Sequence, residues 1–293
     1  MLRDRMNRSD VAILAALLDG PLTVTSVAKA VGRSLAFVSE RLSLMEGMRL
    51  VERRRSGNAV RVGFAKGRAA ADLRLMMAEG PHIGLAEVLP GPGLLILPFL
   101  LPPGSTLREL RGGTGLSAPT IRGRIRPWRG MGLLLVGGTP RRYSIRPQLG
   151  HLIGFIESYA AERNQRLLES RTPAGTIVWQ RRDSFLFSSR VEVSAPEFIP
   201  AGVSRLEELG YDVVSPRHCY IHRPGKTLVA EAEALVQAVL MDPDDPRVAR
   251  MVRRALAEDR VRGDELMGYA LSYGLPEPLK AMMPVGEVAV DGH

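Results

Sequence analysis

Residues 23–46 of the chain read TVTSVAKAVGRSLAFVSERLSLME. The first nine of them predict a short helix, and Gly32 supplies the tight turn that ends it. Ser34 is a favourable N-terminal cap for the next helix, in which apolar side chains recur at i, i+4 and i+7 from Val38 onward. The stretch therefore predicts two helices joined by a tight turn, which is a helix-turn-helix.

The residues on either side extend this unit. Residues 11–18 have apolar side chains at helical spacing and stop at the sequence DGP, residues 19–21, which is typical of a helix end. Residues 50–53 and 59–62 predict two strands around a turn at residues 56–58. Three helices followed by a β-hairpin predict a winged helix-turn-helix.

The same pattern occurs a second time. Residues 11–79 align with residues 94–162 at a constant offset of 83 without a gap, and 14 of the 69 positions are identical. The identities include the turn glycine and the capping serine, which are Gly115 and Ser117 in the second copy. A repeat with matches at these positions predicts a second winged helix-turn-helix.

Two prolines disturb the second copy. Pro98 lies inside the first expected helix, residues 94–101, and Pro127 lies inside the third. A proline in a helix interior costs ~3 kcal/mol because it removes a hydrogen bond and clashes with the preceding turn. We therefore expect the third helix to end or kink near Arg126.

The charge is unevenly distributed along the chain. Residues 1–172 contain 26 Arg and Lys against 13 Asp and Glu, a net charge of +13, whereas residues 173–293 contain 14 against 18, a net of −4. The two parts sum to the overall +9. A basic region of this kind is typical of a phosphate-binding surface, so double-stranded DNA is the expected partner.

In a helix-turn-helix protein the third helix enters the major groove and the hairpin contacts the backbone or the minor groove. The candidate DNA-binding residues are the side chains of these elements that the predicted core does not use. In the first copy they are Ser34, Ala36, Phe37, Ser39, Glu40, Arg41, Arg53, Arg54, Arg55, Asn58 and Arg61. In the second copy they are Ser117, Thr120, Arg122, Arg124, Arg126, Arg129, Arg141 and Arg142. The second copy has the more basic helix and is expected to bind more strongly.

Two alternatives stay open for these residues. A basic run is often only a solvated face, and winged helices also bind proteins. Phe37 is either a contact for a thymine methyl or a partly buried core residue. If DNA binding is correct, affinity should fall with salt by ~0.9 log units per log of salt for each phosphate contacted.

An amphipathic helix follows each hairpin, over residues 68–79 and 151–168. The second carries Leu152, Phe155 and Ile156 on one face. This face either packs on its own domain or forms a homodimer, and the sequence leaves both open.

The C-terminal third predicts a small α+β domain with a helical tail. Strands are expected at 176–179, 184–187, 190–193, 211–214 and 219–222, and helices at 201–209, 227–241 and 245–256. The domains are therefore expected at residues 1–82, 83–172 and 173–293, with residues 171–175 as a linker. The fold class is α+β, mainly α, and the last domain is expected to bind a protein or a small-molecule effector.

The C-terminal third contains no convincing catalytic motif. Residues 224–227 (PGKT) resemble the end of a P-loop, but Tyr220 stands where its first glycine is required. Asp242, Asp244 and Asp245 alternate with prolines, which favours a turn and a helix cap over a metal site. His218, Cys219 and His222 lack a fourth zinc ligand at familiar spacing. We expect no enzyme activity, no metal and no cofactor.

The expected compartment is the cytoplasm. Cys219 is the single cysteine, so the chain cannot form an internal disulfide. The first residues lack the apolar segment of a signal peptide, and the longest apolar run, residues 94–101, is far shorter than the roughly 20 residues of a membrane span.

The tandem units resemble winged-helix transcriptional regulators of archaeal and bacterial type, a similarity that covers about half of the chain. Residues 200–214 faintly resemble the domain that follows the winged helix in abortive-infection antitoxins, where a Gly-x-Ser-x-Leu segment matches Gly202, Ser204 and Leu206. This resemblance implies autoregulatory repression and a protein partner. The antitoxins usually have one winged helix, whereas this chain has two.

Three functions follow from these observations. The leading hypothesis is a transcriptional regulator that contacts duplex DNA through both winged helices. The second is an architectural or chromosome-segregation protein that binds DNA without sequence choice. The third is an enzyme acting on nucleic acid, and it would require a catalytic role for the aspartates at 242–245.

Overall fold

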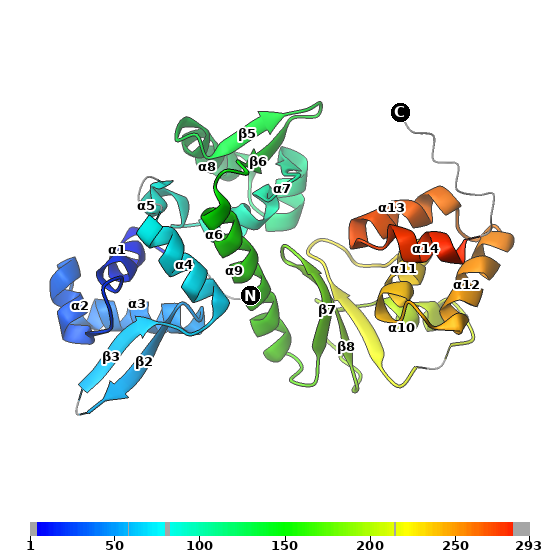
Figure 1. Cartoon of the computed structure of the whole chain (residues 1–293), viewed down its shortest axis with the longest axis horizontal. Helices are drawn as coiled ribbons and strands as arrows, with labels where there is room; N and C mark the ends of the chain where they lie inside the picture. Colours follow the sequence, from blue (N-terminus) through cyan, green and yellow to red (C-terminus); the bar gives the residue numbers. More distant parts are fainter. Residues whose placement is uncertain (1–4, 58, 80–82, 214, 284–293) are drawn as a thin grey trace. The chain divides into compact units, whose positions relative to one another are not determined.

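Three helices and a hairpin form at the N-terminus of the computed structural model, which describes residues 5–57, 59–79, 83–213 and 215–283. Figure 1 shows these elements in blue and cyan. In chain order they are α1 (Arg8–Ala16), β1 (Leu22–Thr23), α2 (Val24–Val31), α3 (Leu35–Gly47), β2 (Val51–Ser56), β3 (Ala59–Phe64) and α4 (Arg68–Glu79). The strands form an antiparallel sheet in the order β1-β3-β2. The helices and hairpin thus follow the order expected from the sequence.

The second repeat has the same elements 83 residues later. They are α6 (Gly93–Ile96), the 3₁₀-helix η2 (Leu97–Leu100), β4 (Ser105–Thr106), α7 (Leu107–Thr114), α8 (Ala118–Gly130), β5 (Leu134–Gly137), β6 (Arg142–Ile145) and α9 (Gly150–Glu169). A short helix, α5 (Leu85–Val88), precedes them. The sheet order is β4-β6-β5, the counterpart of the first sheet.

The turn between the second and third helices is the same in both repeats. Gly32 and Gly115 adopt left-handed conformations, with φ values of 63° and 67°. The hydroxyls of Ser34 and Ser117 accept hydrogen bonds from the backbone N–H groups three residues later. Glycine tolerates a positive φ, and a serine cap satisfies an otherwise unpaired donor, so these two residue types specify the turn.

The effects of Pro98 and Pro127 on the helices of the second repeat differ from those expected from the sequence. Residues 94–101 do not form one helix, because α6 ends at Ile96 and a 3₁₀ turn containing Pro98 continues to Leu100. The third helix does not end near Arg126, since α8 runs through Pro127 to Gly130, and the alternative of a kink there stays a prediction. Pro127 and Gly123 are both exposed, so the carbonyl that loses its helical partner faces water.

The two repeats share one hydrophobic core rather than forming separate domains over 1–82 and 83–172. This core extends along the chain from Met6 to Tyr159 within a compact unit of residues 1–164, and residues 165–293 form a second unit. Arg49 and Glu162 connect the first repeat to α9 by an ion pair of 2.6 Å.

The apolar face of α9 lies inside this core. Leu152 and Phe155 are 0% exposed, and Ile156 is 2% exposed. The expected dimer through residues 151–168 would need this face to be free, so the structure favours the alternative in which the helix packs on its own chain.

The second unit combines an antiparallel sheet with helices. The strands are β7 (Thr176–Arg181), β8 (Ser184–Ser189), β9 (Ile199–Pro200) and β10 (His218–His222), in the order β7-β8-β10-β9. The helices are α10 (Gly202–Glu208), α11 (Glu231–Met241), α12 (Pro246–Ala257), α13 (Gly263–Tyr273) and α14 (Pro276–Met282). Overall the chain is α+β and mainly helical, with 53% helix and 16% strand.

Some expectations for this unit are wrong. Residues 190–193 form no strand, because the backbone N–H of Val193 donates to the Tyr220 hydroxyl (3.0 Å) instead of a strand neighbour. Residues 211–213 are irregular as well, and Val214 lies outside the described residues. The helix expected from Thr227 begins only at Glu231. Within the part of the chain that the structure describes, no helix combines the length and apolarity needed to cross a membrane.

Candidate nucleic-acid interface

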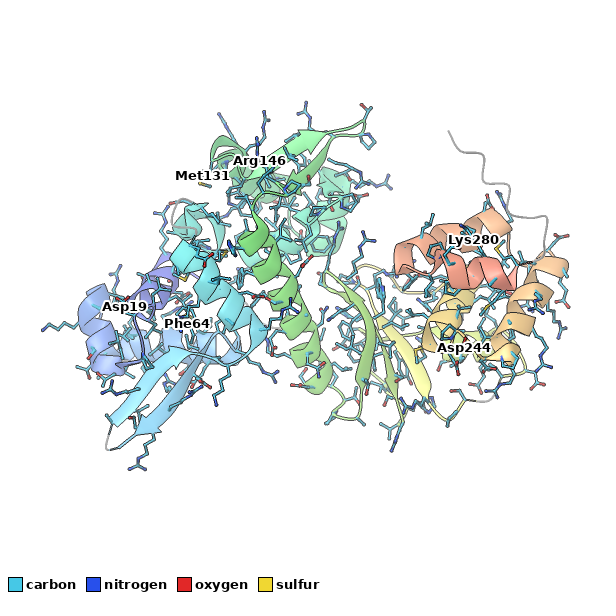
Figure 2. All side chains as sticks on the ribbon, viewed as in Figure 1. Asp19, Phe64, Met131, Arg146, Asp244 and Lys280 are labelled. Carbon is cyan, nitrogen blue, oxygen red and sulfur yellow. The ribbon has the colours of Figure 1, made fainter. Side chains whose placement is uncertain are left out.

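The third helix of the second repeat, α8, exposes three arginines. Arg122, Arg126 and Arg129 are exposed, and Ile121, Ile125 and Trp128 on the other side are buried. The helix contains no acidic residue, so its arginine charges are not neutralised from within the helix. Figure 2 shows the side chains of this repeat, with Met131 after α8 and Arg146 after β6 labelled. This surface matches the basic helix expected from the sequence.

The N-terminus of α8 adds polar groups. Ser117 caps the helix through Oγ, which lies 2.8 Å from Oγ1 of Thr120. Both side chains are exposed. They are available to a phosphate or a base edge at the helix end, where the helix dipole also favours an anion.

The hairpin of this repeat carries two arginines. One is exposed, and the other binds groups of its own chain. Arg141 is exposed before β6, whereas Arg142 binds Glu109 (2.7 Å) and the Gly104 carbonyl (3.1 Å). Burial raises the pKa of Glu109, but the hydrogen bond from the Thr106 backbone and the Arg142 charge outweigh it and leave that pKa lowered. Arg142 therefore holds the hairpin against α7, and Arg141 is the stronger candidate for a ligand contact.

Arg124 turns away from this surface. A β-carbon built on Gly91 would lie 2.5 Å from Nη2 of Arg124, so the guanidinium lies against the segment before α6. Trp128 of the same helix donates from Nε1 to the Glu87 carbonyl at 3.3 Å. Arg124 thus attaches α8 to its own unit and does not belong to the candidate interface.

Arg41 occupies the matching position in the first repeat, and it too binds groups of its own chain. Its Nε and Nη2 bind the two oxygens of Asp10 at 2.7 and 2.5 Å, and Nη2 also donates to the Arg5 carbonyl at 3.2 Å. Asp10 is completely buried. The hydrogen bond to Asp10 raises the pKa of Arg41 further. The expected DNA contact by Arg41 is replaced by an ion pair that fixes α3 to α1.

Arg53 lies across the exposed face of α3. Its guanidinium binds Glu46 (2.5 Å), the Ser39 carbonyl (3.0 Å) and the Ser43 hydroxyl (3.2 Å). The charge of Arg53 is therefore neutralised, and two of the small polar residues of α3 already have partners. Compared with α8, the face of α3 carries little free positive charge.

The other α3 candidates are small, acidic or partly buried. Ala36 and Glu40 are exposed, and Ser34 is exposed at the cap. Phe37 is half-buried against the core, with the Arg33 guanidinium 6.0 Å from the ring centroid. This placement favours the interpretation of Phe37 as a partly buried core residue.

The hairpin arginines of the first repeat do not all lie on the sheet face of Arg53. Arg54 and Arg61 are paired in register across β2 and β3, and their strand positions place them on the opposite sheet face from Arg53. Arg54 forms an ion pair with Glu52, and Arg55 is exposed. Asn58 lies outside the described residues. The sequence run of three arginines is thus divided between the two faces of one sheet.

The second unit contains a buried charged group centred on Glu233. Glu233 is 0% exposed and binds Arg223 (2.5 Å), Lys226 (2.9 Å) and the Tyr273 hydroxyl (2.8 Å). Burial raises its pKa, but Arg223, Lys226 and Tyr273 outweigh burial, and the pKa of Glu233 is lowered. This group anchors the segment before α11 to α13.

The histidine, cysteine and aspartate residues considered as metal ligands have the following surroundings in the structure. Burial raises the pKa of the Cys219 thiol to about 12, and Nδ1 of His222 lies 3.1 Å from the Glu197 carbonyl. Asp245 caps α12 by accepting from the Arg247 backbone N–H, as the turn-and-cap prediction required. Among the described residues no group of three His, Cys, Asp or Glu could hold a metal ion.

Comparison of the chain with protein-family models, with curated proteins and with solved structures gave no match.

Proposed function

We propose that the chain is a DNA-binding protein, a transcriptional regulator built on two tandem winged helix-turn-helix units. The order of three helices and a hairpin in each repeat supports the fold assignment, as do the left-handed glycine and the serine cap at each turn. The exposed face of α8 supports the function, since Arg122, Arg126 and Arg129 lie on a turn-following helix without an acidic residue.

The second repeat makes the main contact in this proposal. α8 enters the major groove, Arg122 and Arg126 contact bases or phosphates, and Arg141 reaches the backbone from the hairpin. The first repeat contributes less, because Arg41 and Arg53 are both neutralised by carboxylates of the chain itself. The acidic C-terminal part binds the partner or effector.

Selection of bound fragments from genomic DNA, followed by footprinting of the full chain, tests this function. Protection of one defined site at 0.1–0.2 M salt supports the regulator. Uniform coating would instead support the architectural protein. Absence of binding at low salt would refute both, because a free arginine surface on α8 should retain nonspecific affinity for duplex DNA.

A further inference from the structure

The first hairpin borders a pocket that the proposed DNA contact does not use. The pocket has a volume of about 490 Å³, within the range of roughly 300–1,000 Å³ that is usual for small-molecule sites. Its lining comes from the turn after α1, from β2 and β3, and from Arg74 of α4. All of these elements belong to the same compact unit.

Four arginines and one carboxylate line this pocket, namely Arg54, Arg55, Arg61, Arg74 and Glu52. Arg61 donates to the Pro21 carbonyl at 3.5 Å, Arg74 donates to the Leu18 carbonyl at 3.1 Å, and Arg54 pairs with Glu52. A guanidinium has five N–H donors, so each of these contacts leaves donors for a further acceptor. The four arginines and Glu52 together carry a charge of +3, which favours an anion such as a phosphate monoester dianion.

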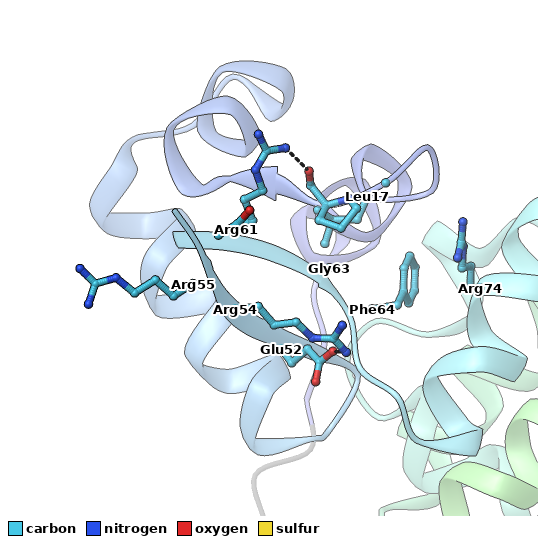
Figure 3. A pocket seen from close by; sticks show the side chains of 11 residues that line it. Leu17, Glu52, Arg54, Arg55, Arg61, Gly63, Phe64 and Arg74 are labelled. Carbon is cyan, nitrogen blue, oxygen red and sulfur yellow. Dashed lines mark hydrogen bonds and ion pairs between the residues drawn. The ribbon is translucent and has the colours of Figure 1, made fainter. Parts of the chain in front are cut away.

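Apolar side chains form another part of the pocket lining. Figure 3 shows Phe64 between Arg54 and Arg74, with Leu17 nearby. Pro21 lies against Gly63, where a β-carbon would be 3.3 Å from Cγ of the proline. A half-buried ring beside guanidinium groups favours a flat apolar group joined to an anion.

The sheet separates this pocket from the candidate DNA surface. Arg53 contacts α3 on one face of the sheet, and its neighbours Glu52 and Arg54 project from the other face. A duplex held against α3 would therefore meet Arg53 and not the pocket. The pocket is better suited to a small ligand than to a polymer backbone.

We propose that this pocket binds a small organic phosphate that carries a flat ring system, of the type represented by a nucleoside 5′-monophosphate. The arginines of the β2-β3 hairpin and α4 hold the phosphate, and Phe64 packs against the ring. Glu52 accepts a hydrogen bond from a hydroxyl or amino group of the ligand. Because the site requires no DNA, it can be tested without assuming the proposed function.

Calorimetric titration of the full chain with AMP, GMP, CMP, UMP and inorganic phosphate tests the proposal. At least one nucleotide should bind with a stoichiometry of one, and more tightly than inorganic phosphate. Arg61→Gln and Arg74→Gln should each weaken that binding tenfold or more. Arg108→Gln is the matched control and should leave it unchanged, because Arg108 is an exposed arginine of the same unit and does not line the pocket.

Three results would overturn the proposal. The first is that none of the four nucleotides binds at 1 mM to wild-type protein shown to be folded by circular dichroism. The second is binding that Arg74→Gln does not weaken. The third is a loss of duplex affinity in Arg61→Gln and Arg74→Gln without nucleotide binding in the wild type, which would assign these arginines to DNA. Loss of DNA binding in α8 variants that still bind nucleotide would refute only the proposed function.

Discussion

Replacing Arg122 and Arg126 together by glutamine tests whether α8 is the DNA contact. The two residues are four positions apart on one exposed helix face, and the helix has no carboxylate that could neutralise them. Both substitutions keep a polar side chain at a solvent-exposed position, so the stability of the unit should change little. A change in DNA affinity can then be assigned to the lost charges.

Counterion release gives the size of the effect. Each phosphate contact contributes ~0.9 to the slope of log affinity against log salt, so two contacts contribute about 1.8. At 0.1 M salt this corresponds to a loss of about 60-fold in affinity for the double variant. If one arginine binds a base edge instead, the loss should also depend on the DNA sequence.

Fluorescence anisotropy with a labelled duplex, measured at several salt concentrations, provides the assay. The matched control replaces Arg190 and Arg250 by glutamine, because both are exposed arginines of the second unit and the net charge falls by the same amount. We expect the control to retain the wild-type slope. A double variant of α8 with the affinity and slope of the control would refute the role of this helix.

Three further predictions concern stability. Arg41→Ala should lower the free energy of unfolding in urea by about 3–5 kcal/mol, because it leaves the buried carboxylate of Asp10 unpaired. A stable Arg41→Ala protein that no longer binds DNA would contradict the assignment of Arg41 to this structural ion pair. Because the pKa of Glu233 is lowered in the folded state, its contribution to stability is present above the ordinary glutamate pKa of about 4.3 and is lost as pH falls below it. The melting temperature of the wild type should thus fall more steeply below this pH than that of Glu233→Gln, and parallel curves would argue against the ion pairs. Gly104→Ala should destabilise the chain by at least ~1 kcal/mol, since φ is +81° and a β-carbon would lie 2.3 Å from a backbone oxygen. Gly112→Ala in the open interior of α7 should stabilise it by about 0.5–1 kcal/mol, and equal effects of the two glycine variants would contradict the geometry.

Local chemistry was sufficient to predict the turns, the caps and most helices from the sequence. Gly32 and Ser34 act through their own backbone and the next three residues, so their identities determine the local structure. Reasoning from local sequence failed where a residue far away in the chain supplies the hydrogen-bond partner. The alternation at residues 190–193 suggested a strand, but the Tyr220 hydroxyl takes the Val193 N–H.

The candidate site was less predictable for the same reason. A helical projection places Arg41 at the edge of the exposed face, but Asp10, 31 residues earlier, binds it in the folded chain. Likewise, three consecutive arginines look like one cationic cluster until alternation along β2 separates Arg53 from Arg54. The sequence gives no signal for Arg74, since its place at the pocket depends on where α4 lies relative to the hairpin.

Comparing the repeats position by position separates structural arginines from candidate functional ones. Arg41 and Arg124 are retained at the same position, and both turn inward to hold their helix. By contrast, Arg122 and Arg126 of α8 replace Ser39 and Ser43 of α3, and those serines are contacted by Arg53.

The position that corresponds to Arg53 in the second repeat is Val136, which has no guanidinium to bind the third helix. The repeats therefore keep one framework while only the second leaves its third helix with free positive charge. Under the proposed function this asymmetry means one strongly basic groove-binding helix per chain. The first repeat then serves mainly to position the second through their shared core and, if the pocket binds its ligand, to connect that ligand to the DNA-binding unit.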